Sequence, residues 1–341
     1  MDNLKKRIEE LEHQISNIII NKYIENLKTD GFVLIPSVLT SEEVDIAKEM
    51  FYKWQKSIPD HDKQHATIDP HGIYKFHEAG HQEHAWFLRT RKSIIDIFKQ
   101  IWDTDELNVS FDGSCYIPQN CIKKDNCWTH TDQAPNSVGV HCYQSFASLT
   151  KNSERTLVLY RHSHDLHQEY FKNRNKKGSK NWELIDPSYL EQIKDTRVVM
   201  DVNPGDLVIW DSRTFHQNQY GKGNSEERIV QYLCYLPKSH IKNTKTQVEK
   251  RRKYFNELRT TSHWPCPINV NGLQPQTYGD ASKLIDYSKL VKPDLEKYMD
   301  TIEFKVKLIN KNNYGYIYKW IKIILKKNLI LNFGYIIHMC Y

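Results

Sequence analysis

Hydrophobic residues at the start of the chain recur at alternating intervals of four and three positions. The residues in this pattern are Leu4, Ile8, Leu11, Ile15 and Ile18. Such spacing gathers apolar side chains into one stripe of an α-helix, so we predict an amphipathic helix over residues 1–24. The stripe is only about two heptads long. It fits a dimerisation helix and equally a helix that packs on its own domain, so the oligomeric state stays open.

A short strand and a second helix are predicted to follow. The segment GFVLIP, at residues 31–36, is an apolar run ended by proline and is typical of a buried strand. Thr40 or Ser41 then precedes two glutamates, an order of residues that favours the start of a helix. The apolar residues beyond them stand at helical spacing: Val44, Ala47, Met50, Phe51 and Trp54.

The period of the pattern changes to two residues from about Asn108 onwards. Short runs of β-branched and aromatic residues alternate there with turns: NVSFDGSCYIP, SVGVHCYQSFASL, RTLVLYRHS, TRVVMDV, GDLVIWD and RIVQYLCYLP. The clearest turn is N-P-G-D at residues 203–206, and one helical insertion is expected over about residues 166–193. We therefore predict a mainly β fold with flanking α-helices, in which an antiparallel sandwich or barrel occupies about residues 108–240.

Composition and motifs exclude several classes of protein. With 39% hydrophobic and 26% charged residues, and only 13 Gly and 12 Pro, the chain can bury a core, which excludes collagen-like and wholly disordered proteins. The sequence contains no internal repeat, no glycine-rich phosphate loop and no G-x-S-x-G motif. Nucleotide-binding and α/β-hydrolase folds therefore have no support.

The net charge of +6 is carried by the last part of the chain, because residues 301–341 contain seven Lys and one Glu. Residues 1–300 are neutral overall, so we expect no nucleic-acid partner. We expect residues 25–300 to form the main domain and residues 301–341 a basic, apolar tail. The tail either contacts an anionic membrane surface or packs on the domain.

Targeting signals and cysteines favour the cytoplasm. The opening residues are too polar for a signal peptide, and lysines interrupt the apolar stretch of the tail, so no transmembrane helix is expected. The cysteines form no C-x-x-C pair and are odd in number: Cys115, Cys121, Cys127, Cys142, Cys234, Cys266 and Cys340. This usage favours a reducing compartment over a disulfide framework or a zinc ribbon.

A candidate metal site begins with the motif H-x-D at His130 and Asp132. In an extended segment, alternate residues point to the same face, so the imidazole and the carboxylate can meet at one point. His216 follows the strand GDLVIWD and supplies a second imidazole. Two histidines and one carboxylate with open coordination positions are typical of non-haem Fe(II), although H-x-D alone is also compatible with a structural histidine.

Arg228 begins the returning strand RIVQYLCYL, which follows His216. A guanidinium that faces the interior of the fold can bind a carboxylate through two parallel hydrogen bonds. The alternative is a surface arginine paired with Glu226 or Glu227. If Arg228 is not a carboxylate anchor, Arg213 is the next candidate.

Taken together, these motifs resemble the phytanoyl-CoA dioxygenase-like family of Fe(II)/2-oxoglutarate oxygenases. The resemblance covers about residues 25–240 and runs through DGFVLIPSVLTSEEV, THTDQ, YQSFASLT, RTLVLYRHSH, NPGDLVIWDSRTFHQN and Arg228. It implies a double-stranded β-helix, or jelly-roll, core. It further implies that His130, Asp132 and His216 bind the iron and that Arg228 binds the distal carboxylate of the cosubstrate 2-oxoglutarate.

The resemblance also implies two further site residues. Gln144 stands where the cosubstrate-facing strand of the family runs, so it is expected to help bind 2-oxoglutarate. His164 matches the histidine of the family pattern P-G-[ST]-H, although this chain reads YRHSH there. We place His164 in the substrate pocket.

Aromatic and histidine-rich segments supply the remaining candidates. Trp128 and Phe215 flank the metal ligands and are either walls of the pocket or plain core. A histidine-rich stretch comprises His61, His65, His71, His77, His81 and His84. Its irregular spacing and lack of cysteine argue against zinc, so we expect it to cover the mouth of the barrel, with Trp86 and Arg89 lining the substrate pocket. The segment SHWPCP, at residues 262–267, receives no role.

The function that the resemblance implies is oxidation of a C–H bond, most simply hydroxylation, of a small-molecule or lipid-like substrate. O₂ is consumed, and 2-oxoglutarate is converted to succinate and CO₂. Two other readings stay open: a catalytically silent jelly-roll binding protein, and a membrane-peripheral scaffold that uses the tail. The identity of the substrate cannot be read from these motifs, because it depends on the shape of the pocket.

Overall fold

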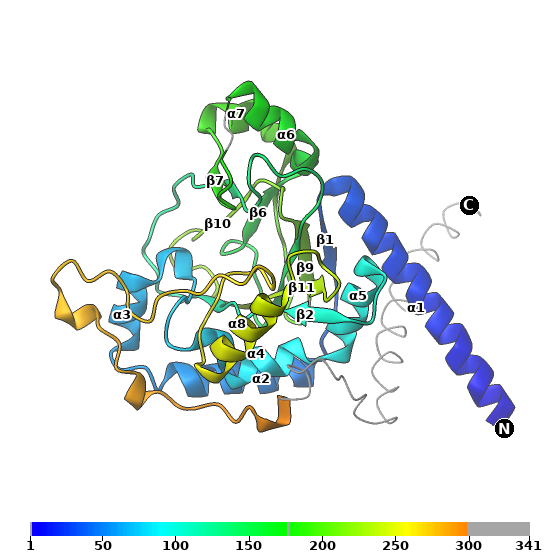
Figure 1. Ribbon diagram of the computed structural model, residues 1–341, viewed down its shortest axis with the longest axis horizontal. Coiled ribbons are helices and arrows are strands. Elements are labelled where there is room, and N and C mark those ends of the chain that lie inside the picture. Colours follow the sequence, from blue (N-terminus) through cyan, green and yellow to red (C-terminus); the bar gives the residue numbers. More distant parts are fainter. Residues whose placement is uncertain (1, 176–177, 299–341) are drawn as a thin grey trace, which may run out of the picture.

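The computed structural model describes residues 2–175 and 178–298, and Figure 1 shows their arrangement. Two antiparallel sheets form the centre. The six-stranded sheet has the order β1-β9-β5-β11-β2, with β3 also paired to β11, and the five-stranded sheet has the order β7-β4-β10-β6-β8. The larger sheet contains β1 (Phe32–Ile35), β2 (Leu107–Val109), β3 (Ser114–Ile117), β5 (Tyr143–Ser148), β9 (Leu207–Asp211) and β11 (Arg228–Pro237). The smaller sheet contains β4 (His130–Thr131), β6 (Leu157–Tyr160), β7 (Glu183–Leu184), β8 (Arg197–Val199) and β10 (His216–Asn218).

Between β4 and β11 the chain passes repeatedly from one sheet to the other. The two sheets enclose a hydrophobic core to which both contribute, with Phe146 and Trp210 from the larger sheet and Leu157 and Leu159 from the smaller. Antiparallel strands that alternate between two facing sheets define a jelly roll. The predicted mainly β fold, with a double-stranded β-helix core, is confirmed.

Helices cover the outer face of the larger sheet, and others pack beside the smaller sheet (Figure 1). The helices are α1 (Asp2–Asp30), α2 (Ser41–Gln55), α3 (His61–Ile68), α4 (Glu83–Arg89), α5 (Lys92–Trp102), α6 (Ser163–Asn173), α7 (Pro187–Gln192) and α8 (Lys245–Asn256). Successive residues of β9 therefore enter two different cores. Val208 faces the other sheet, whereas Leu207 and Ile209 pack against the helices.

The second predicted helix forms as its sequence indicates. The Thr40 hydroxyl accepts a hydrogen bond from the Glu43 amide, and the Glu43 carboxylate accepts one from the Thr40 amide. This reciprocal pair satisfies amide groups that a helix otherwise leaves free at its start. Val44 and Phe51 are buried on the inner face of α2.

The first helix is longer than predicted and continues to Asp30. Its last turns carry Ile24 and Leu27 into the core against the larger sheet, whereas Leu11 and Ile18 are 43% and 68% exposed. The side chains of Leu4 and Ile8 lie outside those that the structure describes. Packing on the domain is thus achieved by residues after the predicted stripe, and the role of the stripe in dimerisation stays a prediction.

The predicted helical insertion over residues 166–193 is wrong as a single element. Two helices, α6 and α7, flank the short strand β7, whose Leu184 pairs with His130 of β4. The extended segment is favoured because it supplies hydrogen-bond partners to β4, which would otherwise be a sheet edge. β7 thereby approaches the strand that carries the first candidate metal ligand.

No helix among the described residues has both the length and the apolar character needed to cross a bilayer. Residues 301–341, for which membrane contact or packing on the domain is expected, lie outside the described part of the chain.

Candidate active site

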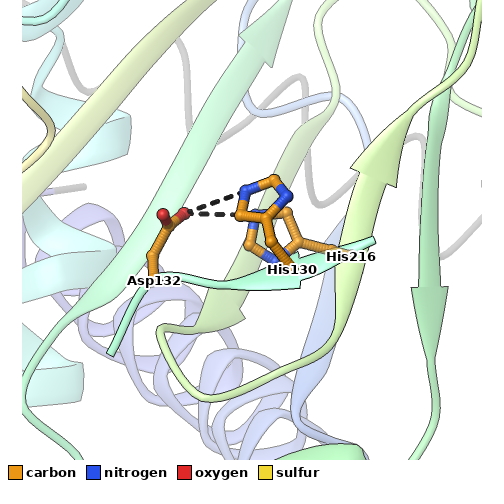
Figure 2. Close-up of side chains that lie close together, drawn as sticks. All are labelled: His130, Asp132 and His216. Atoms are coloured by element: carbon orange, nitrogen blue, oxygen red, sulfur yellow. Dashed lines mark ion pairs between the residues drawn. The ribbon is translucent and has the colours of Figure 1, made fainter. Parts of the chain in front are cut away.

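Three candidate ligands meet at one end of the smaller sheet. His130 of β4 lies directly opposite His216 of β10 in the antiparallel pairing of these strands. Asp132 follows β4, and its Oδ2 lies 3.6 Å from Nε2 of His130 and 3.3 Å from Nε2 of His216 (Figure 2). The three ligand atoms all lie within 4.8 Å of one another, and all three residues are buried. In the described part of the chain, this is the one group of His, Cys, Asp or Glu side chains that can hold a metal ion.

Backbone contacts turn both imidazoles toward the same point. Nδ1 of His130 donates to the carbonyl of Trp128 at 3.1 Å, and Nδ1 of His216 donates to the carbonyl of Thr214 at 2.8 Å. Each ring therefore carries its proton on Nδ1 and presents the lone pair of Nε2 to the site. This is the arrangement that metal-binding histidines usually adopt. A histidine that is merely structural does not require two such lone pairs to converge on one carboxylate.

The electrostatics of the triad favour a divalent cation. Burial by itself raises the pKa of Asp132, but the neighbouring imidazoles of His130, His263 and His216 outweigh it and hold the pKa well below its usual range. Burial, together with His130, lowers the pKa of His216. The site thus combines an ionised carboxylate with a neutral imidazole at position 216. Two nitrogen donors and one carboxylate fit the set that binds Fe(II) and leaves positions open.

Gln144 orients the carboxylate ligand. It lies on β5, and its Nε2 donates a hydrogen bond of 3.0 Å to Oδ2 of Asp132. The sequence predicted a role in binding the cosubstrate. The structure brings Gln144 to the site, but the contact that it makes there is with a metal ligand. Such contacts to ligands strongly influence metal affinity.

Arg228 is fully buried at the start of β11. None of its three guanidinium nitrogens has a hydrogen-bond partner among the described residues, and the guanidinium carbon lies 5.3 Å from the centre of the Phe146 ring. The expected surface alternative is wrong: Glu226 accepts hydrogen bonds from the backbone amides of residues 153–155, and Glu227 accepts one from Tyr52. A buried cation without a partner is costly, so this position requires an anion.

The distance from the triad to this cation suits a short diacid. Gln144, which contacts Asp132, and Phe146, which lies beside the guanidinium, are two residues apart on β5 and share one face of the strand. Two strand residues span about 7 Å. The reserve candidate, Arg213, is already paired, because its Nη2 lies 2.7 Å from the carboxylate of Asp211. Of these two candidates, Arg228 is therefore the one that is available to a carboxylate bound beside the triad.

One side of the triad is aromatic. Trp128 stacks on His130 with ring centres 4.9 Å apart, and His71 also stacks on the tryptophan at 3.6 Å. The ring of Trp182 lies 5.6 Å from that of His130 and is 37% exposed. Trp128 was predicted for the pocket. Trp182 was missed because it falls in the misassigned insertion, and the pairing of β7 with β4 is what brings it to the site.

Three residues that were predicted to line the substrate pocket lie away from the triad: Trp86, Arg89 and His164. The Arg89 guanidinium donates to the backbone carbonyls of Gly80 and Asp112 in the helical layer, where Trp86 packs against Phe111. These two residues follow the helical period of α4, which turns them into the core outside the larger sheet.

His164 also serves packing. Its Nε2 donates to the carbonyl of Lys28 at 3.0 Å, at the end of α1. Its ring lies so close to Gly31 that a Cβ atom there would be 2.4 Å from Nδ1 of the histidine. No contact of His164 with the triad is present among the described residues.

Most of the histidine-rich stretch is structural as well. His65 bridges Asp69 and the carbonyl of Tyr116, and His84 hydrogen-bonds the hydroxyl of Ser114. Of this stretch, His71 joins the aromatic stack beside the triad. Phe215 is fully buried among aromatic side chains of α6 and α7, so it belongs to the core.

Comparison with known proteins agrees with this geometry. The family model for phytanoyl-CoA dioxygenase (PhyH) matches residues 27–220, which is more than half of the chain. The chain therefore belongs to the phytanoyl-CoA dioxygenase family, and the predicted resemblance is confirmed. Family, fold and triad together define an Fe(II)- and 2-oxoglutarate-dependent oxygenase.

Individual relatives are more distant. The Ava biosynthesis cluster protein O of Aspergillus versicolor is 24% identical over 259 residues, which are 69% of this chain and 83% of that protein. Among solved structures, the 2-oxoglutarate-dependent carbocyclase SnoK of nogalamycin biosynthesis is 16% identical, with a TM-score of 0.46 over 63% of this chain and 83% of that one. HygX from Streptomyces hygroscopicus, solved with nickel and 2-oxoglutarate, is 12% identical, with a TM-score of 0.44 over 64% of this chain and 86% of that one.

Proposed function

We propose that this protein is a dioxygenase that hydroxylates a C–H bond of a small-molecule or lipid-like substrate and releases succinate and CO₂. The observation that carries the proposal is that a candidate metal site and a buried arginine occur together between the two sheets. A triad of two histidines and a carboxylate is contacted by Gln144, and a buried guanidinium that has no partner among the described residues lies beside Phe146, two residues further along β5. The first feature suits Fe(II), and the second suits the distal carboxylate of 2-oxoglutarate.

The bound iron and cosubstrate supply the oxidising chemistry, and the protein supplies their placement. His130, Asp132 and His216 would hold the metal. Gln144 restrains the carboxylate of Asp132, so the ligand set is arranged before the metal arrives. Arg228 fixes the far end of the cosubstrate, and the apolar core around Phe146 keeps water from the guanidinium.

The substrate is proposed to lie against the aromatic side of the triad. Trp128 and the partly exposed Trp182 present flat apolar surface next to His130. Such surface binds apolar or ring-containing molecules through area and stacking. A role in the biosynthesis of a small molecule agrees with the name of the Aspergillus relative. Because Asp132 retains its carboxylate, hydroxylation is proposed rather than halogenation.

Domain organisation and location complete the proposal. Residues 25–300 are proposed to form the dioxygenase domain, with α1 fastened to it by its last turns and residues 301–341 as an appendage. The six cysteines in the described part of the chain are all free, which supports a reducing compartment such as the cytoplasm.

A turnover assay tests the proposal. The purified protein is supplied with Fe(II), 2-oxoglutarate and O₂, and succinate is measured with and without a metabolite library whose products are followed by mass. We expect succinate release that requires iron and increases when the substrate is present. A protein that binds iron and 2-oxoglutarate but forms no succinate with any library member would favour the silent binding protein instead.

A further inference from the structure

The segment after α8 returns to the metal site, although its sequence suggested no role. The amide of Thr261 donates to the carbonyl of Phe111 at 2.9 Å, which fastens the segment to the loop between β2 and β3. Trp264 packs in a small buried cluster with Cys142 and Cys234. Cys234 in turn pairs with Gln144, the residue that contacts Asp132. These contacts place residues 261–264 on the β5–β11 side of the triad.

His263 is the titratable side chain of this segment, and it lies near the triad. Its imidazole acts electrostatically on Asp132, His130 and His216. Its Nε2 is buried and has no hydrogen-bond partner among the described residues. Buried polar atoms in proteins are nearly always paired, so an unpaired ring nitrogen beside a metal site indicates a partner that arrives with a ligand.

The position of His263 identifies which ligand. The aromatic wall of Trp128 and Trp182 lies on the β4–β7 side of the triad. The segment that carries His263 packs through Trp264 on the side of β5 and β11, the strands that carry Gln144 and Arg228. A diacid held at its far end by Arg228 therefore extends along these strands toward the metal, with its other end on the side of His263.

We propose that Nε2 of His263 hydrogen-bonds the end of 2-oxoglutarate that lies at the metal, opposite the end that Arg228 holds. This inference rests on the proposed function, because it assigns a cosubstrate contact within the same site. It makes His263 part of the cosubstrate pocket, whereas Trp264 belongs to the neighbouring apolar cluster. The proposal also distinguishes His263 from the three ligands, since replacing His263 should weaken the binding of 2-oxoglutarate and leave metal binding intact.

The test compares four proteins under anaerobic conditions: the wild type, His263→Phe, His263→Gln and Trp264→Phe. Phenylalanine fills the volume without a polar atom, whereas the glutamine amide can place a donor near the position of Nε2. Trp264→Phe is the matched control, because it alters the adjacent buried ring and spares the imidazole. Fe(II) affinity, 2-oxoglutarate affinity and the visible charge-transfer absorption of the Fe(II)–2-oxoglutarate complex are measured for each.

We expect His263→Phe to weaken 2-oxoglutarate about tenfold or more and to shift the absorption band, as loss of a hydrogen bond to a charged group would do. Fe(II) affinity should change by less than about twofold, since the three ligands and the hydrogen bonds that orient them stay in place. His263→Gln should recover most of the affinity, and Trp264→Phe should match the wild type.

The possible failures are separable. If the wild type itself does not bind 2-oxoglutarate, the proposed function fails. If the wild type binds and His263→Phe binds equally well with an unchanged band, only the role of His263 is overturned. Loss of Fe(II) affinity in both His263 variants would also overturn it, because the residue would then act through the triad. Should His263→Phe not fold, as judged by circular dichroism, the glutamine variant still decides, since loss of 2-oxoglutarate affinity there would contradict a donor role.

Discussion

His216 lies directly opposite His130 across the pairing of β10 with β4, with ring centres 4.4 Å apart. These residues are far apart in sequence and meet because one register joins the two strands. A slip of one residue would turn His216 to the other face of the sheet. The iron site therefore depends on strand register as much as on the identity of its ligands.

Replacing a ligand should remove the metal. His216→Ala is expected to lower Fe(II) affinity by more than about 100-fold, since changes outside the ligand set alone cost about 10–100-fold. Succinate formation should disappear with it. Anaerobic Fe(II) titration measures the affinity, and His141→Ala is the control because His141 bonds within its own loop. Full activity in His216→Ala would contradict the assignment of the triad.

Arg228→Lys should weaken the cosubstrate more than the metal. Lysine keeps the charge but loses the planar pair of donors, so we expect the KM for 2-oxoglutarate to rise about tenfold or more with Fe(II) affinity nearly unchanged. Steady-state kinetics with varied 2-oxoglutarate measures this. An unchanged KM would show that another residue is the anchor.

Arg228→Met gives a complementary stability measurement. The variant removes a buried cation that lacks a partner among the described residues. Without 2-oxoglutarate, its free energy of unfolding should therefore exceed that of the wild type by about 1–3 kcal/mol, and it should unfold at a higher temperature. Added 2-oxoglutarate should stabilise the wild type and not the variant. A variant that is less stable than the wild type would indicate that the guanidinium has a partner within the fold.

Gln144→Leu tests the support of the carboxylate ligand. Leucine has nearly the same size but cannot donate to Asp132, so Fe(II) affinity should fall about 10–100-fold. Ser145→Ala is the matched control, because Ser145 lies next on β5 and bonds the carbonyl of Leu233 instead. Equal Fe(II) affinities in the two variants would show that the bond from Gln144 does not orient the ligand.

Stability should decrease in acid because of buried histidines. Burial, with a smaller contribution from Arg89, lowers the pKa of His84 to about 3, so the folded protein keeps this ring neutral. The unfolded chain takes up the proton below its ordinary pKa of about 6.5. The contribution of the neutral His84 to the free energy of unfolding is therefore fully present above pH 6.5. It is lost as the pH falls toward 3, by up to about 1.4 kcal/mol per pH unit.

Urea unfolding of the metal-free protein at several pH values measures this slope. His84→Gln can retain the bond to Ser114 but does not titrate, so its stability should vary less with pH than that of the wild type. The same slope in both proteins would contradict the assignment to His84.

The tail gives a prediction that rests on charge alone. Residues 301–341 carry the net charge of +6, so any affinity for anionic vesicles should reside there. It should fall with salt, because the Debye length shrinks from about 10 Å at 0.1 M to about 3 Å at 1 M. A chain that ends at Asp300 should keep iron binding and turnover while it loses vesicle binding in flotation. An inactive or insoluble truncated chain would show that the tail is part of the domain.

Local order in the sequence was sufficient for most strands of the core, for the start of the second helix and for the candidate metal ligands. Alternation by two residues defined the strands, the Thr40–Glu43 pair marked a helix start, and H-x-D placed two ligands on one face because extended backbone does so by geometry. Arg228 could also be proposed from the sequence, because it is the first residue of a strand whose alternate residues were expected to face the interior. These features depend on neighbours in the chain, which the sequence displays directly.

Tertiary structure decided which side chains surround those ligands. Trp182 comes beside His130 only through the pairing of β7 with β4, and the segment that carries His263 comes near the triad only because the chain after α8 returns to β5 and β11. Trp86 and His164 looked equally suitable but face the helical layer and the end of α1. Such placements depend on contacts between segments far apart in the chain and on which face of each element is covered. The pattern of a single segment does not contain that information.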